Sequence, residues 1–178
     1  PPLKATVMVR EQLGFALNRL GRRDEAERIL TALIEERGPS SETLGILGRV
    51  YKDRWQEANT AGDSILAQGY LQKAAETYLA GFESDWRDAY PGINAVTLMS
   101  LQDPPDPRRT EILPVVRYAV RRKMARGKPD YWDQATLLEL AVLEGDEKEA
   151  RGLLPIAYSC VREGWEPKTT AGNLAMIR

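Results

Sequence analysis

The sequence contains no histidine and a single cysteine, Cys160. These two deficits exclude zinc sites of the usual Cys and His type, and they remove the commonest general base at neutral pH. One thiol cannot close an internal disulfide, which favours a reducing compartment, and we expect a cytoplasmic location. We therefore predict a non-catalytic protein without cofactor or metal, in which Cys160 is a buried structural thiol rather than a nucleophile.

Long apolar stretches are also lacking. The longest uncharged run, residues 89–102, is too short to cross a bilayer, and no signal peptide is evident. The net charge of -1 argues against a general affinity for nucleic acid. The chain of 178 residues starts without Met and ends inside a predicted helix, so we expect a fragment of a longer protein. Arg (18) outnumbers Lys (7), which favours a bacterial source.

The apolar residues of the sequence recur with helical periodicity. Leu44, Leu47, Gly48 and Tyr51 have the spacing of the first helix of a tetratricopeptide repeat. Positions 74 and 78, a small residue and a large one, fit the second helix, where two helices approach closely. About fourteen additional residues, 54–67, separate these two halves, and they either lengthen the helices or form a loop. Leu13, Gly14, Ala26 and Leu30 repeat the pattern in a unit of ordinary length.

Several short motifs carry a resemblance to a known family. These are Gly-Arg-Val-Tyr-Lys-Asp at 48–53, Lys-Ala at 73–74 with Tyr78, Tyr-Pro-Gly-Ile-Asn at 90–94 and Tyr-Trp-Asp at 131–133. In order and spacing, residues 44–178 resemble the central regulatory region of the apoptosis signal-regulating kinases, called the TRAFs-binding domain, and its bacterial relatives. The resemblance implies a tetratricopeptide-like module that regulates the domains attached to it.

These patterns predict an all-α, tetratricopeptide-like array of four helix pairs and a terminal helix, wound as a right-handed superhelix. We expect one domain, 1–178, with repeats at 7–40, 41–86 (including the insert), 88–127 and 130–164, and a terminal helix at 168–178. Asp24 and Ser41 are the predicted N-caps of the second and third helices. The third pair is predicted to begin at Pro91, and Pro155 is predicted to kink its helix.

In such an array the first helix of each pair lines the inner surface, which favours binding of a protein or peptide. The candidate partner-binding residues on this surface are Glu11, Phe15, Asn18, Arg49, Lys52, Asn94, Trp132 and Glu139. Asn94 has a structural alternative, in which its amide ties down a neighbouring segment. Lys52 and Asp53 have one too, as a salt bridge that holds the insert.

A second candidate surface is basic. Arg117, Arg121, Arg122 and Arg126 lie in one helical segment and suit an acidic or phosphate-bearing partner. The alternative is a solvated face opposite acidic neighbours at 85, 88 and 103.

Three functions remain open on these residues. The first is a protein-binding regulatory scaffold of a multidomain signalling or defence protein, whose partner is another protein or a neighbouring domain of the same chain. The second is a sensor that binds a nucleotide-like ligand through Arg49, Lys52 and the basic face. The third is an enzyme of unfamiliar type.

Overall fold

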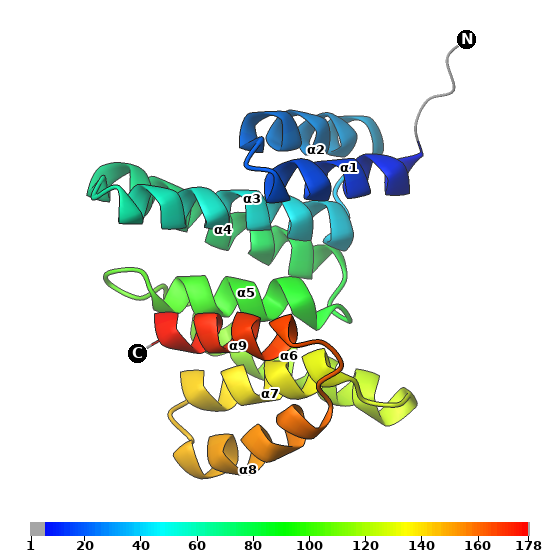
Figure 1. The fold of residues 1–178 in the computed structure, drawn as a ribbon, viewed down its shortest axis with the longest axis vertical. Coiled ribbons are helices and arrows are strands. Elements are labelled where there is room, and N and C mark those ends of the chain that lie inside the picture. The colour runs from blue at the N-terminus through cyan, green and yellow to red at the C-terminus, as the bar shows by residue number, and fades with distance from the viewer. Residues whose placement is uncertain (1–5, 178) are drawn as a thin grey trace. The chain divides into compact units, whose positions relative to one another are not determined.

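Residues 6–177 are described here from a computed structural model, and within this range the chain forms nine α-helices and no strand (Figure 1). The helices are α1 (Val7–Arg19), α2 (Arg23–Arg37), α3 (Ser41–Thr60), α4 (Ser64–Ser84), α5 (Ala89–Ser100), α6 (Arg109–Arg126), α7 (Tyr131–Leu143), α8 (Glu147–Ser159) and α9 (Trp165–Met176). The predicted all-helical fold is confirmed. None of the nine helices is both long enough and apolar enough to cross a membrane.

The helices group into two compact units, and the boundary falls between Asp85 and Trp86. In the first unit α1 pairs with α2 and α3 with α4, and α3 also packs on both helices of the first pair. In the second unit α5 pairs with α6 and α7 with α8; α7 packs on both helices of the preceding pair, and α9 packs on α7. Packing of consecutive helix pairs is the arrangement typical of a helical-repeat array.

Side chains of short polar residues set most helix starts. Ser40, not Ser41, caps α3: its backbone is extended and its hydroxyl accepts a bond of 3.1 Å from the Thr43 amide. The predicted cap at Asp24 is also wrong, because α2 already begins at Arg23 and has no side-chain cap. Asp24 lies instead in the first turn, where the helix dipole favours a carboxylate.

Two further helix boundaries differ from the prediction. Asp88 caps α5, so the helix begins at Ala89 and Pro91 lies within its first turn. The terminal helix begins at Trp165, because the Glu166 carboxylate accepts bonds from the amides of Arg162 and Glu163 (2.8 and 3.1 Å). The helical range of α8 continues through Pro155, from Glu147 to Ser159.

The inserted residues 54–67 lengthen both helices of the second pair rather than forming a loop. α3 continues to Thr60, and α4 starts at Ser64 after a turn in which Gly62 adopts a φ of 77°. That left-handed conformation costs little only for glycine. Asp63 then caps α4 by accepting a bond of 3.0 Å from the Leu66 amide.

Two glycines mark where paired helices approach most closely. A Cβ atom at Gly14 would lie 2.9 Å from the Leu30 side chain, and one at Gly48 would lie 2.8 Å from the Tyr78 ring. Ala26 and Ala74, the small residues of the partner helices, are completely buried. These four positions agree with the predicted repeat register.

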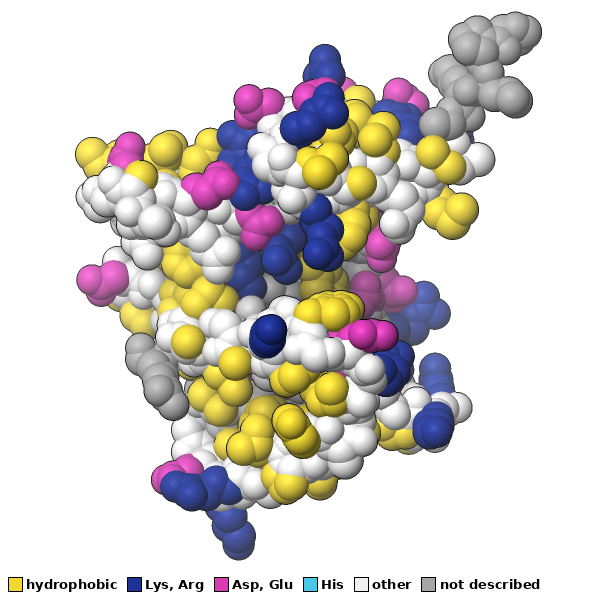
Figure 2. Space-filling view, viewed as in Figure 1, with side chains coloured by type: hydrophobic (Ala, Val, Ile, Leu, Met, Phe, Trp, Pro, Cys, Tyr) yellow, Lys and Arg dark blue, Asp and Glu magenta, His cyan; other side chains and the backbone are white. Residues whose placement is uncertain are grey.

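Several apolar side chains in and next to α1 are exposed, although Leu17 is buried. Val9, Leu13 and Leu20 are 48%, 47% and 73% exposed, and apolar side chains gather over this helix in Figure 2. The buried side of α1 instead carries Glu11, Gly14, Leu17 and Asn18. Polar groups are thus part of the interface between α1 and the rest of the unit.

We predict that Gly48→Ala destabilises the fold by about 1–3 kcal/mol, since the added methyl group meets the Tyr78 ring in a fully packed interior. Gly152→Ala is the matched control: Gly152 lies in α8, and a Cβ atom added there would have no neighbouring atom within 4 Å. That change should therefore stabilise by about 0.5–1 kcal/mol through helix propensity alone. Urea unfolding followed by circular dichroism measures both. Equal effects of the two substitutions would contradict the close approach at Gly48.

Candidate partner-binding site

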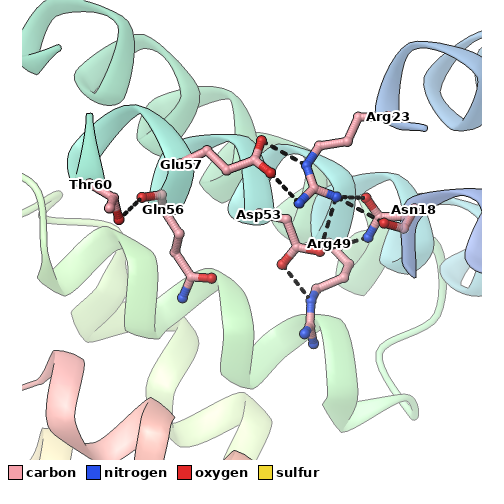
Figure 3. Close-up of polar contacts among 7 residues, drawn as sticks. All are labelled: Asn18, Arg23, Arg49, Asp53, Gln56, Glu57 and Thr60. Carbon is pink, nitrogen blue, oxygen red and sulfur yellow. Dashed lines mark hydrogen bonds and ion pairs between the residues drawn. The ribbon is translucent and has the colours of Figure 1, made fainter. Parts of the chain in front are cut away.

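A polar cluster joins α1, α2 and α3 in the first unit (Figure 3). The Asn18 amide donates to the Asp53 carboxylate at 2.7 Å, which links α1 to α3. The Arg23 guanidinium donates to the Asn18 backbone carbonyl and side-chain oxygen at 2.9 and 3.0 Å, and its distance to Asp53 is 3.9 Å. Asn18 is 3% exposed, so its amide is satisfied within the protein rather than by solvent.

The same cluster reaches the outer turns of α3. Arg23 Nε donates to Glu57 at 2.8 Å, and this contact raises the pKa of Arg23 and lowers that of Glu57. Arg49 Nε donates to the other Asp53 oxygen at 2.8 Å, while 45% of the Arg49 side chain remains exposed. Asp53 therefore fixes the base of an arginine whose side chain is partly exposed.

Phe15 lies beside this cluster, one turn before Asn18 on α1. Its ring is 40% exposed, and the Arg19 guanidinium lies 5.7 Å from the ring centroid. α1 and α3 run in the same direction (Figure 1), and Arg49 is one turn before Asp53. The Asn18–Asp53 bond joins the two helices, with Phe15 one turn before Asn18 on α1 and Arg49 one turn before Asp53 on α3. We call Phe15, Arg19 and Arg49 the first-unit surface.

Two other predicted residues of this unit are buried. Glu11, 8% exposed, accepts a bond of 2.6 Å from the Thr43 hydroxyl and so connects α1 to α3. Lys52 is 4% exposed. Neither side chain lies on the first-unit surface in this conformation.

A second polar cluster fastens α2 to α3 and α4. Glu27 accepts bonds from the Tyr51 hydroxyl (2.8 Å) and the Lys73 ammonium (3.1 Å). Arg54 reaches Glu27 at 3.0 Å and donates to the Tyr70 hydroxyl at 3.0 Å. Burial opposes ionisation of Glu27, but these bonds outweigh it, so the pKa of Glu27 is lowered.

The predicted basic face belongs to the second unit, where carboxylates of the following helix pair oppose it. Arg117 contacts both Glu144 and Glu149, and only 13% of its side chain is exposed. Arg121 lies 3.4 Å from Glu149. The acidic partners of Arg117 and Arg121 are therefore at 144 and 149. Arg122 and Arg126 are exposed on the same helix.

Asn94 is 8% exposed, and its amide donates to the Tyr90 carbonyl at 2.9 Å within α5. Trp132 and Glu139, both on α7, face α9. The Trp132 and Trp165 ring centroids are 5.6 Å apart, and Glu139, 6% exposed, accepts a bond of 3.0 Å from Asn173. The structure brings Asn18 and Arg49 to the same carboxylate, that of Asp53, with Phe15 one turn before Asn18. Asn94, Trp132 and Glu139 lie in the other unit.

Sequence reasoning does not single out Arg23, Glu27, Arg54 or Tyr70. The sequence pattern places Arg23 in a turn and Arg54 in the insert, so neither has a predicted facing direction. Arg54 and Tyr70 lie on opposite helices of the lengthened pair. The one available signal is the Lys73–Ala74 motif, which places Lys73 on the helix that pairs with the helix of Tyr51.

Packed consecutive helix pairs, with polar clusters between the pairs, define a helical-repeat module. The chain belongs to the MAP3K TRAFs-binding domain family, whose model matches residues 2–178. The match thus includes the first helix pair, which lies outside the range of the sequence motifs.

One relative is the mitogen-activated protein kinase kinase kinase nsy-1 of Caenorhabditis elegans, which is 29% identical over 187 residues. The alignment covers 97% of this chain and 12% of that protein, so the chain corresponds to a small part of the kinase. No solved structure matches the chain.

Glu27→Gln tests the second cluster. Because the folded state lowers the Glu27 pKa, the ionised carboxylate adds stability above its unfolded pKa of about 4.3 and loses it as the pH falls through the folded value. We expect the wild-type chain to be more stable than the variant by about 1 kcal/mol at pH 7. This difference should shrink below about pH 4.

Urea unfolding at about pH 7 and about pH 3.5, on either side of the unfolded pKa, measures both differences. The control is Glu35→Gln, an exposed position on the same helix, which should change stability by less than about 0.5 kcal/mol at either pH. A Glu27→Gln effect that is independent of pH would contradict the assigned role of the charge.

Proposed function

We propose that this chain is a non-catalytic protein-interaction and regulatory module of a multidomain signalling or defence protein, and that it works in the cytoplasm. Membership of a family described as TRAFs-binding supports a protein partner. Similarity to a small part of a kinase kinase kinase supports a module that is attached to other domains and regulates them. We also propose that the four helix pairs are four repeats of one array, and that the chain comes from a bacterial member of the family.

The observation that carries the proposal is the first-unit surface. An exposed aromatic ring and an exposed guanidinium each lie one turn before a residue of a partly buried hydrogen bond that joins two helices. Fixed positions reduce the conformational entropy lost on binding, and aromatic and arginine side chains are the commonest interface anchors. Basic and acidic side chains are interspersed over the upper part of Figure 2, without a continuous field of one sign.

The chemistry of these residues describes the partner. An apolar side chain can pack on the Phe15 ring, while a carboxylate can pair with the solvent-facing side of Arg19 or Arg49. We therefore expect the bound segment of the partner to carry an acidic residue close to an aromatic or aliphatic one. Charges at the rim contribute mainly to association rate and register, whereas the buried ring contributes affinity.

The same residues support a nucleotide sensor less well. Lys52 is buried, and Arg117 is already paired with two carboxylates, which repel phosphate. Arg49 shares its guanidinium with Asp53. A protein surface needs only the exposed edges of these groups, while a phosphate site needs several cations aimed at one point.

The family description suggests a TRAF protein as the first partner to test. We predict that Phe15→Ala combined with Arg49→Ala weakens binding at least about tenfold, since truncating interface anchors commonly costs more than about 1 kcal/mol each. The melting temperature should be nearly unchanged, because both side chains are substantially exposed. Isothermal titration calorimetry with the purified TRAF protein measures the affinity.

Tyr118→Ala combined with Arg122→Ala is the matched control. It removes an exposed aromatic residue and an exposed arginine one turn apart on α6, outside the first-unit surface. Binding that survives the first double substitution, or that falls equally with both, would remove the first-unit surface from consideration.

A further inference from the structure

The face that α9 presents to α7 is polar. Only Glu166 and Thr170 of α9 are buried, whereas α2 buries Ala26, Leu30 and Leu33 against its partner. An interface of this kind removes little apolar area from water, so it gains little from the hydrophobic effect. Hydrogen bonds contribute modestly because water competes for the same groups.

The contacts of α9 include two hydrogen bonds and one ring contact. The Tyr131 hydroxyl donates to Thr170 Oγ1 at 2.8 Å, and the Asn173 amide donates to Glu139 at 3.0 Å. At the start of the helix, the Trp165 ring lies 5.6 Å from that of Trp132, while Trp165 remains 55% exposed. Both partners of the Tyr131–Thr170 bond are buried. A group that lies opposite Tyr131 must therefore be able to accept a hydrogen bond from its hydroxyl.

α9 also packs differently from the helices that continue the array. α3 lies on both α1 and α2, and α7 lies on both α5 and α6, but α9 packs chiefly on α7. α8 correspondingly leaves Leu154 and Tyr158, which share one face, 55% and 71% exposed. Within the second unit α9 therefore packs mainly on one helix, and segments with few buried apolar contacts open at the lowest free energy.

We propose that α9 is a displaceable internal ligand, and that the α7 face formed by Tyr131, Trp132 and Glu139 is a docking surface for a helix of a partner protein. The spacing of Trp165, Thr170 and Asn173 defines the partner: an amphipathic helix with an aromatic residue, a hydroxyl five residues later and a carboxamide three residues after that. Such a helix satisfies the same buried groups on α7. The proposal deepens the proposed function, but its first test observes α9 itself.

Hydrogen exchange of the full chain tests whether α9 opens on its own. The α9 amides should exchange at least about tenfold faster than those of α7, and Thr170→Val with Asn173→Leu should accelerate α9 about tenfold further. Lys168→Ala, at an exposed position of the same helix, should leave the rates unchanged. Unchanged protection of α1 to α6 shows that the variant is folded. Exchange of α9 at the same rate as α7 would overturn the proposal.

A peptide of residues 163–177 tests the docking surface. In the wild-type chain α9 occupies the surface, so the labelled peptide should bind weakly, because apparent affinity falls with the fraction of open molecules. The Thr170→Val, Asn173→Leu chain should bind it at least about tenfold more tightly in fluorescence anisotropy, and adding Tyr131→Phe with Glu139→Gln should abolish the gain.

Equal binding to the wild-type chain and the weakened variant would show that α9 does not compete for this surface. The two proposals fail separately. TRAF binding is tested by substitutions at Phe15 and Arg49 in the first unit. Hydrogen exchange of α9 and binding of the peptide are measured in the second unit. A chain that binds a TRAF protein through Phe15 and has a fully protected α9 retains the first proposal and loses the second.

Discussion

The close approach of paired helices is the constraint on which the rest of this structure depends. At Gly48 the backbone of α3 lies directly against the Tyr78 ring of α4, and at Gly14 the backbone of α1 lies against Leu30 of α2. A larger residue at either glycine would push the helices apart. Because α3 also packs on α1 and α2, the spacing within one pair determines where the side chains of the next pair meet.

The polar clusters exploit that fixed spacing. Asn18 and Asp53 come from helices of different pairs, and their bond of 2.7 Å forms only when both pairs hold their distance. Leaving either group buried without its partner would cost more than the bond contributes, so the cluster specifies the packing as much as it stabilises it. The exposed side chains of Phe15 and Arg49 lie on the helices that this cluster joins.

Helical periodicity allows prediction of the helices and of the glycine contacts, since both depend on residues close in sequence. Cap positions are harder to predict, because Ser40 and Ser41 are chemically equivalent and only backbone geometry separates them. The facing direction of α1 does not follow from its apolar residues alone, since Val9 and Leu13 are exposed while Leu17 is buried. The ion pairs of Arg23 with Glu57 and of Arg54 with Glu27 require the tertiary arrangement, which brings residues 34 and 27 positions apart to contact distance.

The lengthened second pair has a consequence for how this fold tolerates insertion. α3 has 20 residues against 13 in α1, and α4 has 21 against 15 in α2, or about two helical turns more in each. About seven residues advance a helix by two turns with a drift of only about 20°, so each helix keeps its direction of facing beyond the added segment. An insertion shared between two antiparallel helices in this way leaves the direction in which each helix face points nearly unchanged. Natural variation in the length of such hairpins should therefore proceed in steps of about one heptad per helix, leaving Gly48 opposite Tyr78.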